Sequence, residues 1–279
     1  MPPDTGRGRW GTVADYALTL TDTEIARYRF MAHAALQTER DQWASAGVGH
    51  GARVADIGCG PGAVAIVLAG LVGASGTVHA LDRDPAALAV ARDMAKAAGA
   101  TNIVCSEGAA TDTGLAPGSV DVVMLRHVLA HNGGREQAIV QHLASLVRPG
   151  GCVYLVDIDA TAMRMRPPEN AAAMMEMAER YAQFHAGLGN DLSVGLRLGD
   201  LLERAGLEDV DHRGRYEIIR PRPGMRPPAW AARAEMLAAG VVNDDDLTRW
   251  QAEFDRLDRG EVSFTLFMST FTAAARRPA

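Results

Sequence analysis

The chain has 279 residues, of which 48% are hydrophobic and 22% charged, and its formal net charge is −6. This composition is typical of a globular protein with a substantial core, and a prior of roughly 100–200 residues per domain favours one large domain or one domain with appendages. The chain is acidic overall and so lacks the basic surface that nucleic-acid binding requires. It contains no apolar stretch of about 18 residues, so no membrane span is predicted.

The first 50 residues are predicted to form a helical segment that caps the main domain, residues 51–279. Residues 1–11 lack the apolar core of a signal peptide, so we expect a cytoplasmic protein. Thr21-Asp-Thr-Glu24 has the form of a capping box. Apolar residues then recur at helical spacing, which predicts one amphipathic helix over residues 22–44.

A strand, a glycine-dense loop, a helix and a second strand follow one another next. The predicted bounds are Arg53–Ile57 for the first strand, Ala63–Val72 for the helix and Thr77–Leu81 for the second strand. The loop has glycine at alternating positions, Gly58, Gly60 and Gly62. Asp56 lies just before the loop, and Asp82 ends the second strand. This order predicts a nucleotide-binding βαβ unit, in which glycines let the backbone approach a ligand and an acid accepts the ribose hydroxyls.

Two classes of ligand suit this unit. Gly58, Gly60 and Ala63 satisfy the G-x-G-x-x-[GA] pattern of dinucleotide enzymes. The pyrophosphate of a dinucleotide, however, is an anion held at the helix N-terminus, and the carboxylate of Asp56 would repel it. A ligand with a positive group at this point suits Asp56 better, such as the ammonium and sulfonium of S-adenosylmethionine.

The motif Asp56-x-Gly58-x-Gly60-x-Gly62 resembles the first motif of the class I S-adenosylmethionine-dependent methyltransferases. Further segments resemble the family in order up to Asp159. The resemblance implies an α/β, Rossmann-like, doubly wound fold whose seven-stranded sheet is mostly parallel, with an antiparallel edge strand and a helical cap. It also implies S-adenosylmethionine as the cofactor and S-adenosylhomocysteine as the product.

The resemblance assigns further cofactor contacts. It places the ribose on Asp82 and the adenine along Arg83. Gly108 and Ala109 stand where many relatives have Gly-Asp, whose acid binds the adenine amino group. Because this chain has alanine there, that hydrogen bond is expected from the backbone, from Asp112 or from no residue.

Strands and helices alternate downstream, which predicts a mostly parallel sheet with helices on both faces. Strands are predicted at 102–106, 120–126, 152–158, 210–220 and 262–274, and the resemblance pairs the last two antiparallel at one edge. Helices are predicted at 85–98, 135–146, 169–185, 195–205, 229–239 and 244–257. Insertions at about 160–195 and 221–260 are expected to complete the cap.

The catalytic candidates leave the strand at 120–126, in a segment that resembles the family's fourth motif. Arg126 is expected to contact the cofactor, because strand ends of open α/β sheets meet the ligand crevice. His127 and His131 would share one face if the segment is helical, so that one of them orients the acceptor or takes its proton. Metal binding is the alternative for two histidines at this spacing, but no third ligand is near in the sequence, and no metal is expected. A histidine that merely binds backbone is equally open.

The acceptor side depends more on resemblance. Tyr16, with Glu24 and Arg27, is similar to the opening of small-molecule methyltransferases from bacterial natural-product pathways, and it is counted as catalytic. Three residues are expected to contact the substrate: Tyr28, Asp157 and Phe184. An arginine-paired Asp157 is an alternative, and plain core packing is the alternative for the methionines at 163–177.

These features predict methyl transfer to an oxygen, nitrogen or carbon atom of a small aromatic or apolar metabolite. The partner is expected to be this acceptor rather than nucleic acid or membrane, and the protein a monomer or homodimer. The alternatives are a quinone-type C-methyltransferase, a protein that uses S-adenosylmethionine for another reaction, and, more remotely, an NAD-dependent dehydrogenase.

Overall fold

The structure is a computed structural model, which describes residues 21–279. Among these residues seven strands form a sheet in the order β3-β2-β1-β4-β5-β7-β6. The strands are β1 (Arg53–Ile57), β2 (Thr77–Asp82), β3 (Ile103–Glu107), β4 (Val120–Arg126), β5 (Val147–Arg166), β6 (Glu208–Ile219) and β7 (Thr265–Arg276). Strands β1 to β5 pair in parallel, whereas β7 is antiparallel to both β5 and β6. The predicted fold class is confirmed, with the antiparallel strand second from the edge.

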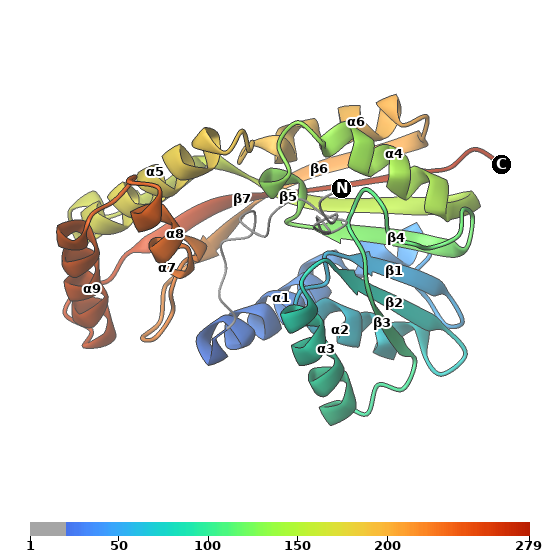
Figure 1. The fold of residues 1–279 in the computed structure, drawn as a ribbon, viewed down its shortest axis with the longest axis horizontal. Helices are drawn as coiled ribbons and strands as arrows, with labels where there is room; N and C mark the ends of the chain where they lie inside the picture. Colours follow the sequence, from blue (N-terminus) through green and yellow to red (C-terminus); the bar gives the residue numbers. More distant parts are fainter. Residues whose placement is uncertain (1–20) are drawn as a thin grey trace, which may run out of the picture.

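Helices cover both faces of the sheet (Figure 1). They are α1 (Asp22–Ala46), α2 (Ala63–Val72), α3 (Pro85–Ala97), α4 (Glu136–Leu146), α5 (Ala172–Gly187), α6 (Leu198–Arg204), α7 (Pro228–Ala231), α8 (Arg233–Ala238) and α9 (Asp244–Asp258), with 3-10 turns η1 (Leu129–His131), η2 (Pro168–Asn170) and η3 (Val194–Arg197). The first three helices lie on one face, and α4 and α6 lie on the other. None of the helices within residues 21–279 is long and apolar enough to cross a membrane.

Strand residues alternate between two cores, because successive side chains of a strand point to opposite faces. Val54, Met124 and Tyr154 belong to the core under α1 and α2, whereas Ala55, Leu125 and Leu155 belong to the core under α4 and α6. Asp56 and Arg126 follow Val54 and Met124 by two residues. Their side chains therefore lie on the α1 side of the sheet.

Strand β5 is longer than predicted. The sequence predicts residues 152–158, but the strand covers Val147–Arg166 and pairs with β7 as far as Arg166 and Thr265. A register shift between Asp159 and Arg164 divides this ladder. The continuous apolar run ends at Asp157, and charged residues recur as far as Arg166, so the apolar pattern gave no sign of the continuation. Residues 160–166 are strand and not part of the expected helical insertion.

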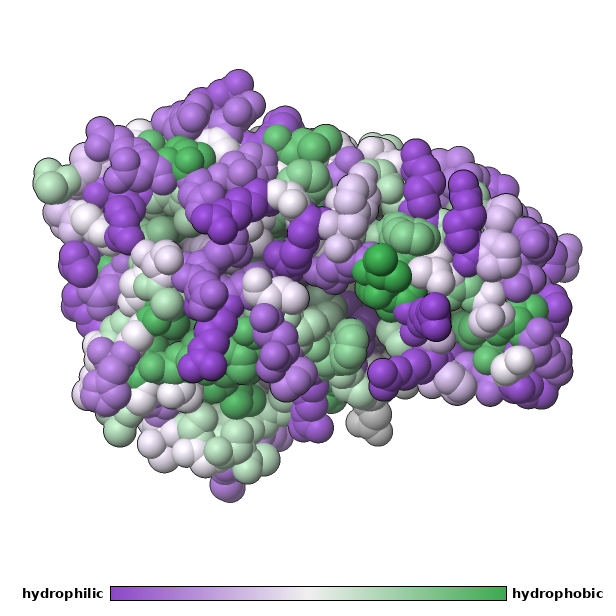
Figure 2. Space-filling view, turned by 180° about the vertical axis from the view of Figure 1, so that it is seen from behind, coloured by the Kyte–Doolittle hydropathy of each residue, from purple (hydrophilic) through white to green (hydrophobic). Residues whose placement is uncertain are grey.

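The far ends of β5 and β7 carry a helical lobe, which consists of α5, α7, α8 and α9 (Figure 1). Met174, Met177, Trp250 and Phe254 are buried inside it. Three of the clustered methionines, Met165, Met174 and Met177, are thus ordinary core residues. Seen from behind, the surface is hollowed between the body of the sheet and this lobe, and apolar side chains gather beside the hollow (Figure 2).

Candidate active site

The glycine loop joins β1 to α2 in a conformation that requires glycine. The backbone angle φ is +68° at Gly58, +52° at Gly60 and +77° at Gly62, a region that side chains rarely adopt. Space is restricted as well, because a Cβ atom on Gly58 would lie 2.5 Å from Val128 Cγ2, and one on Gly62 would lie 2.9 Å from Ala91 Cβ. The loop therefore carries no side chains at these three positions, so its main chain can be approached closely.

Asp82, at the end of β2, is tied to this loop. Its Oδ2 accepts a hydrogen bond from the Gly60 amide at 2.7 Å, and its Oδ1 accepts one from the Asp84 amide at 2.9 Å. Burial raises the pKa of Asp82, and the two amides oppose this effect. Asp84, not Asp82, caps α3, because its Oδ1 accepts from the Ala86 amide at 2.8 Å. The carboxylate of Asp82 is thus not consumed as a helix cap.

Asp56 is a buried carboxylate with an unsatisfied oxygen. It is 2% exposed, and its Oδ2 has no hydrogen-bond partner among the described residues. Burial raises its pKa to about 7, and Asp82 adds to this rise whereas Arg126 opposes it. An unsatisfied buried carboxylate is costly. A positively charged group from a ligand would satisfy it.

S-adenosylmethionine fits these residues. Its ammonium and sulfonium are positive groups, which suit the unsatisfied oxygen of Asp56, and its ribose hydroxyls suit the carboxylate of Asp82. When bound, it supplies a methyl group on a positively charged sulfur for in-line displacement, a reaction that depends on alignment. A dinucleotide fits less well, because its pyrophosphate would face the carboxylate of Asp56.

The residues expected near the adenine follow β2 and β3. The Gly108 amide donates to the Asp82 carbonyl at 3.0 Å, and a Cβ atom on Gly108 would lie 3.0 Å from the Thr113 carbonyl oxygen. Ala109 exchanges two main-chain hydrogen bonds with Asp112, of 3.1 and 2.9 Å. The Ala109 amide is therefore already used. The exposed Asp112 stays a candidate for the adenine amino group, and Arg83 is also exposed.

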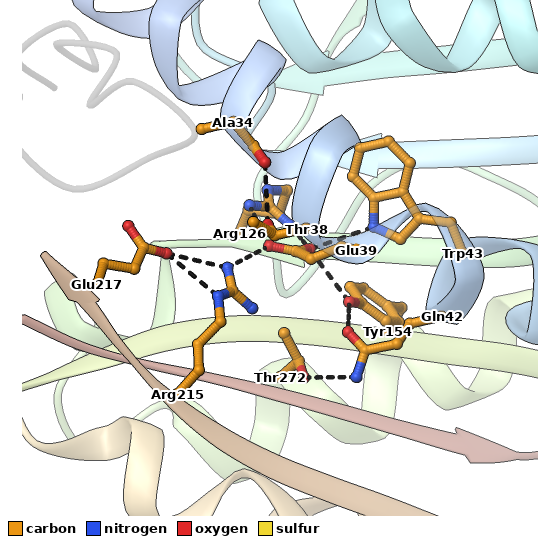
Figure 3. A network of polar contacts seen from close by, with 10 residues as sticks. All are labelled: Ala34, Thr38, Glu39, Gln42, Trp43, Arg126, Tyr154, Arg215, Glu217 and Thr272. Atoms are coloured by element: carbon orange, nitrogen blue, oxygen red, sulfur yellow. Dashed lines mark hydrogen bonds and ion pairs between the residues drawn. The ribbon is translucent and has the colours of Figure 1, made fainter.

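Arg126 pairs with Glu39 of α1, a residue that the sequence analysis did not identify (Figure 3). Its Nη1 and Nη2 lie 2.5 and 3.2 Å from Oε2 and Oε1 of Glu39. Glu39 also accepts hydrogen bonds from Arg215 at 2.8 Å, from the Tyr154 hydroxyl at 3.1 Å and from the Trp43 indole at 3.2 Å. Arg126, expected to contact the cofactor, thus forms an internal ion pair in this structure.

Glu39 is fully buried and ionised. Burial would raise its pKa, but Arg126 and Arg215 outweigh burial and hold the pKa at about 2. The sequence does contain a signal for this residue. Glu39 interrupts the apolar stripe of α1 between Ala35 and Trp43, and a charge in such a stripe needs a buried partner.

The chain turns sharply as it leaves β4. His127 has φ of +54°, a strained conformation for a residue other than glycine, and its amide donates to the Val156 carbonyl at 2.8 Å. The next residues form the single 3-10 turn η1 rather than an α-helix. His127 and His131 therefore do not share a helical face.

Both of these histidines are neutral at pH 7. Burial, together with the charge of Arg126, lowers the pKa of His127 to about 3. Burial, together with His185 and Arg83, lowers the pKa of His131 to about 4. Neutral imidazoles can orient an acceptor through hydrogen bonds, but with such pKa values they are weak bases at this pH.

Asp157 holds the turn η1 from below. It is 1% exposed, and its Oδ2 and Oδ1 accept from the Ala130 and Ile158 amides at 3.1 and 3.0 Å. Burial raises its pKa to about 7 despite these amides. Its carboxylate is thus used internally. Asp157, expected to contact the substrate, thus supports the turn that carries His131.

A cluster of rings faces this turn from α5. The ring centroid of His185 lies 4.8 Å from that of His131, 4.3 Å from that of Tyr181 and 5.3 Å from that of Phe184. Phe184, an expected substrate contact, is 7% exposed and belongs to the core of the helical lobe. His185 was not predicted, and it follows Phe184 at the end of a helix whose apolar spacing gave no sign of a polar site.

Hydrogen bonds define the tautomer of His185. The Gly133 amide can only donate, so the Asn190 atom 3.0 Å from it is the oxygen Oδ1. The amide nitrogen Nδ2 of Asn190 then donates to Nδ1 of His185 at 3.0 Å. Burial lowers the pKa of His185 to about 4, so the neutral ring carries its proton on Nε2. This buried N–H has no hydrogen-bond partner among residues 21–279.

The first half of α1 covers the glycine loop. A Cβ atom on Gly60 would lie 3.6 Å from the ring of Tyr28, and the guanidinium of Arg27 lies 4.8 Å from the centroid of that ring. Burial raises the pKa of Tyr181 in α5, and the charge of Arg27 opposes this rise. Tyr28 is therefore close to the loop, with Arg27 beside it. Tyr16, the other tyrosine expected here, lies outside the described residues.

The chain spans about a third of the length of the curated relatives that it matches. Methyltransferase psoC of Aspergillus fumigatus is 32% identical over 98 residues, which are 34% of this chain and 34% of that protein. An arsenite methyltransferase of Aquipseudomonas alcaligenes is 34% identical over 117 residues, which are 39% of this chain and 34% of that protein.

Solved structures share the fold over most of the chain. The YcgJ protein of Bacillus subtilis has a TM-score of 0.57 at 16% identity, and the match covers 88% of this chain and all of that one. A protein of Bacillus halodurans C-125 has a TM-score of 0.56 at 17% identity, with 87% of this chain and all of that one covered. At such identities the likeness concerns the fold alone.

The family model described as "Methyltransferase domain" matches residues 49–206, more than half of the chain. The matched region begins before β1 and ends after α6, so it includes the glycine loop, Asp82 and the turn that follows β4. The chain therefore belongs to the methyltransferase domain family, which confirms the class and the S-adenosylmethionine cofactor implied by its motifs.

Proposed function

We propose that this protein transfers the methyl group of S-adenosylmethionine to an oxygen, nitrogen or carbon atom of a small aromatic or apolar metabolite. The observation that carries the proposal is the unsatisfied carboxylate of Asp56 beside the bare glycine loop. Asp82 lies across the same loop, as a ribose ligand should. A cationic nucleoside meets both demands, whereas the anionic pyrophosphate of NAD does not.

The acceptor side of the proposal is supported by the ring cluster of His131, Tyr181, Phe184 and His185. Ring side chains with few polar groups suit a flat, largely apolar molecule. The Nε2–H of His185 offers such a molecule one hydrogen-bond donor, which selects an acceptor with a carbonyl, ether or phenolic oxygen. The acidic net charge favours such an acceptor over nucleic acid.

The resemblance to natural-product enzymes supports a place in secondary metabolism, and the fungal relative is likewise named as a methyltransferase. We propose a cytoplasmic enzyme that acts as a monomer or homodimer. A quinone ring is one flat acceptor that would suit the same cluster.

Arsenite is not proposed as the acceptor, although one relative bears that name. Thiolates, not thiols, are the ligands of soft metals and metalloids. Cys59 and Cys152 are buried, and burial raises the pKa of Cys59, Cys105 and Cys152, that of Cys152 to about 11. All three are therefore protonated at pH 7. No group of three or more His, Cys, Asp and Glu side chains in the described part of the chain could hold a metal ion.

Isothermal titration with S-adenosylhomocysteine, with NADH as the control ligand, tests the cofactor. We expect dissociation constants of roughly micromolar order for the first and no measurable binding for the second. Labelled S-adenosylmethionine with a panel of phenols, quinones and aromatic amines then tests the acceptor. Binding of NADH but not of S-adenosylhomocysteine would contradict the proposal.

A further inference from the structure

We infer that Glu39 is a positioning residue of the cofactor site: it holds the guanidinium of Arg126 away from Asp56 and so reserves that carboxylate for the cation of the cofactor. The inference rests on the proposed binding of S-adenosylmethionine. It assigns a role to the buried network of Figure 3, which lies on the same side of the sheet as Asp56.

The strand register brings Arg126 within reach of Asp56. Strands β1 and β4 are parallel neighbours in which Asp56 is opposite Met124. Arg126 follows Met124 by two residues, so it lies on the same face, one diagonal step from Asp56. Neighbouring strands are about 4.8 Å apart and two residues of a strand span about 6.6 Å, so the Cα atoms are about 8 Å apart. An arginine side chain can bridge that distance.

The two carboxylates therefore compete for one buried cation. Among the influences on the pKa of Asp56, the charge of Arg126 is the largest that favours ionisation, which indicates how near it lies. Nevertheless, the hydrogen bonds of the Arg126 guanidinium that the structure gives go to Glu39, through both terminal nitrogens. Asp56 Oδ2 remains without a partner among the described residues.

Arg126 pairs with Glu39 rather than with Asp56 because the surroundings of Glu39 stabilise its negative charge. Arg215, Tyr154 and Trp43 all donate to its oxygens, and its pKa is held at about 2. Asp56 has no such donors in the part of the chain that the structure describes, and its pKa is about 7. The bidentate pair of Arg126 with the fully ionised Glu39 is therefore stronger than a pair of Arg126 with Asp56.

Without the charge at position 39, a buried arginine would be left unpaired, which is strongly unfavourable. Asp56 is the carboxylate on the neighbouring strand that could replace Glu39. An Arg126–Asp56 pair would satisfy both groups, and the ammonium of the cofactor would then have to displace a buried guanidinium. Glu39 thus prevents Arg126 from pairing with the carboxylate that the cofactor ammonium needs.

Titration with S-adenosylhomocysteine, which retains the ammonium, tests the inference. For Glu39→Gln we expect binding weaker by about tenfold or more, because the ligand must break a buried ion pair. For Arg126→Gln we expect wild-type affinity within about threefold, because the competitor is absent and Arg215 still satisfies Glu39. The double variant Glu39→Gln/Arg126→Gln should recover the affinity that Glu39→Gln loses.

Two other outcomes would overturn the inference. If Arg126→Gln alone loses tenfold or more, and the double variant does not recover it, Arg126 is itself a cofactor ligand. If Glu39→Gln weakens binding and removal of Arg126 does not restore it, Glu39 merely supports α1. Glu176→Gln, which breaks the exposed pair of Glu176 with Arg249 in the helical lobe, is the matched control and should bind normally.

A crystal structure of Glu39→Gln separates this inference from the proposed function. Arg126 placed on Asp56 shows that Glu39 holds the guanidinium away from Asp56, even if wild-type protein fails to bind S-adenosylhomocysteine. In that case the proposed function fails, and with it the part of the inference that concerns the cofactor. Arg126 still placed on Gln at position 39, or turned to solvent, refutes it. If Glu39→Gln does not fold, Arg126→Gln still decides, since a loss of affinity there contradicts the inference.

Discussion

The Gly60 amide donates a 2.7 Å hydrogen bond to Oδ2 of Asp82, which ties the loop after β1 to the end of β2. The cofactor acid thereby also shapes the loop that faces the cofactor. Its other oxygen accepts from the Asp84 amide, so both oxygens are already oriented before a ribose arrives. Such preorganisation lowers the entropic cost of ligand binding.

Asp82→Ala should therefore weaken the binding of S-adenosylhomocysteine by more than about tenfold, because a hydrogen bond to a charged group is worth roughly 1.5–3 kcal/mol. Isothermal titration measures this change. Asp84→Ala is the matched control two residues away, since Asp84 caps α3. Loss of the cap should cost about 1 kcal/mol of unfolding free energy and leave affinity nearly unchanged. Near-normal binding by Asp82→Ala would remove Asp82 from the site.

Gly58→Ala should disable the cofactor site, because alanine meets both a positive φ and the side chain of Val128 at 2.5 Å. Gly99→Ala is the comparison, since Gly99 has a similar φ of +66° but nothing within 4 Å of an added Cβ. Thermal unfolding should show a loss of about 1 kcal/mol for Gly99→Ala and a larger loss for Gly58→Ala, where the contact with Val128 adds to the backbone strain. Loss of S-adenosylhomocysteine binding should be specific to Gly58→Ala. Equal binding by the two variants would mean that close packing at Gly58 does not matter.

Much of the fold could be predicted because local patterns and tertiary pairing agree. The observed bounds of β1, α2 and β4 are those that the sequence predicts. The apolar runs there end at glycine or polar residues, which makes the bounds visible in the sequence. The cofactor loop was recognisable for the same reason, since glycines and acids are local signals. The length of β5 was not predictable, because charged residues interrupt the apolar run in its far half and that half depends on pairing with β7.

The contacts in the site that the sequence did not reveal join residues distant in sequence. Arg126 and Glu39 are 87 residues apart, and Asp157 binds the Ala130 amide 27 residues away. A charge at a strand end can face a ligand, an internal partner or a backbone amide, and the sequence does not say which. His185 could be identified as a site residue only from its hydrogen bond with Asn190, which in turn accepts a hydrogen bond from the Gly133 amide.

Cofactor affinity should depend on pH through Asp56. Burial raises its pKa to about 7, so the carboxyl is largely protonated at pH 6 and ionised at pH 8. The ammonium of S-adenosylhomocysteine binds the ionised form, so affinity for this ligand should rise as pH increases through 7, with proton release on binding below that pH. Titrations in buffers of different ionisation enthalpy measure both effects. Asp56→Asn should bind weakly at every pH, and an unchanged pH dependence in that variant would contradict the assignment.

The same raised pKa has an opposite effect on stability. The unfolded carboxyl ionises near its ordinary value of about 4, whereas the folded one ionises near 7. The folded state thus retains the proton longer, and the contribution of Asp56 to stability declines as pH increases from about 4 to about 7. Asp56→Asn should reduce this decline in urea unfolding series, but not abolish it, because Asp157 has a similar pKa.

Asn190 and His185 allow a test of the acceptor side that needs no identified substrate. In the wild type, Asn190 donates to Nδ1 of His185, so Nε2 carries the ring proton. Asn190→Asp replaces the donor by a carboxylate, which favours a proton on Nδ1 and converts Nε2 from a donor to an acceptor. Long-range 1H–15N correlation spectra of the imidazoles report the change directly.

The functional consequence follows from that exchange. If the Nε2–H binds an oxygen of the methyl acceptor, Asn190→Asp and His185→Phe should both reduce kcat/KM by about tenfold or more, the cost of an unpaired polar group in the complex. Affinity for S-adenosylhomocysteine should stay within about twofold, because neither residue contacts the glycine loop. Asn190→Ser, which retains a hydroxyl donor for Nδ1, should preserve part of the activity. If the tautomer changes in Asn190→Asp while turnover does not, His185 has no role in acceptor recognition.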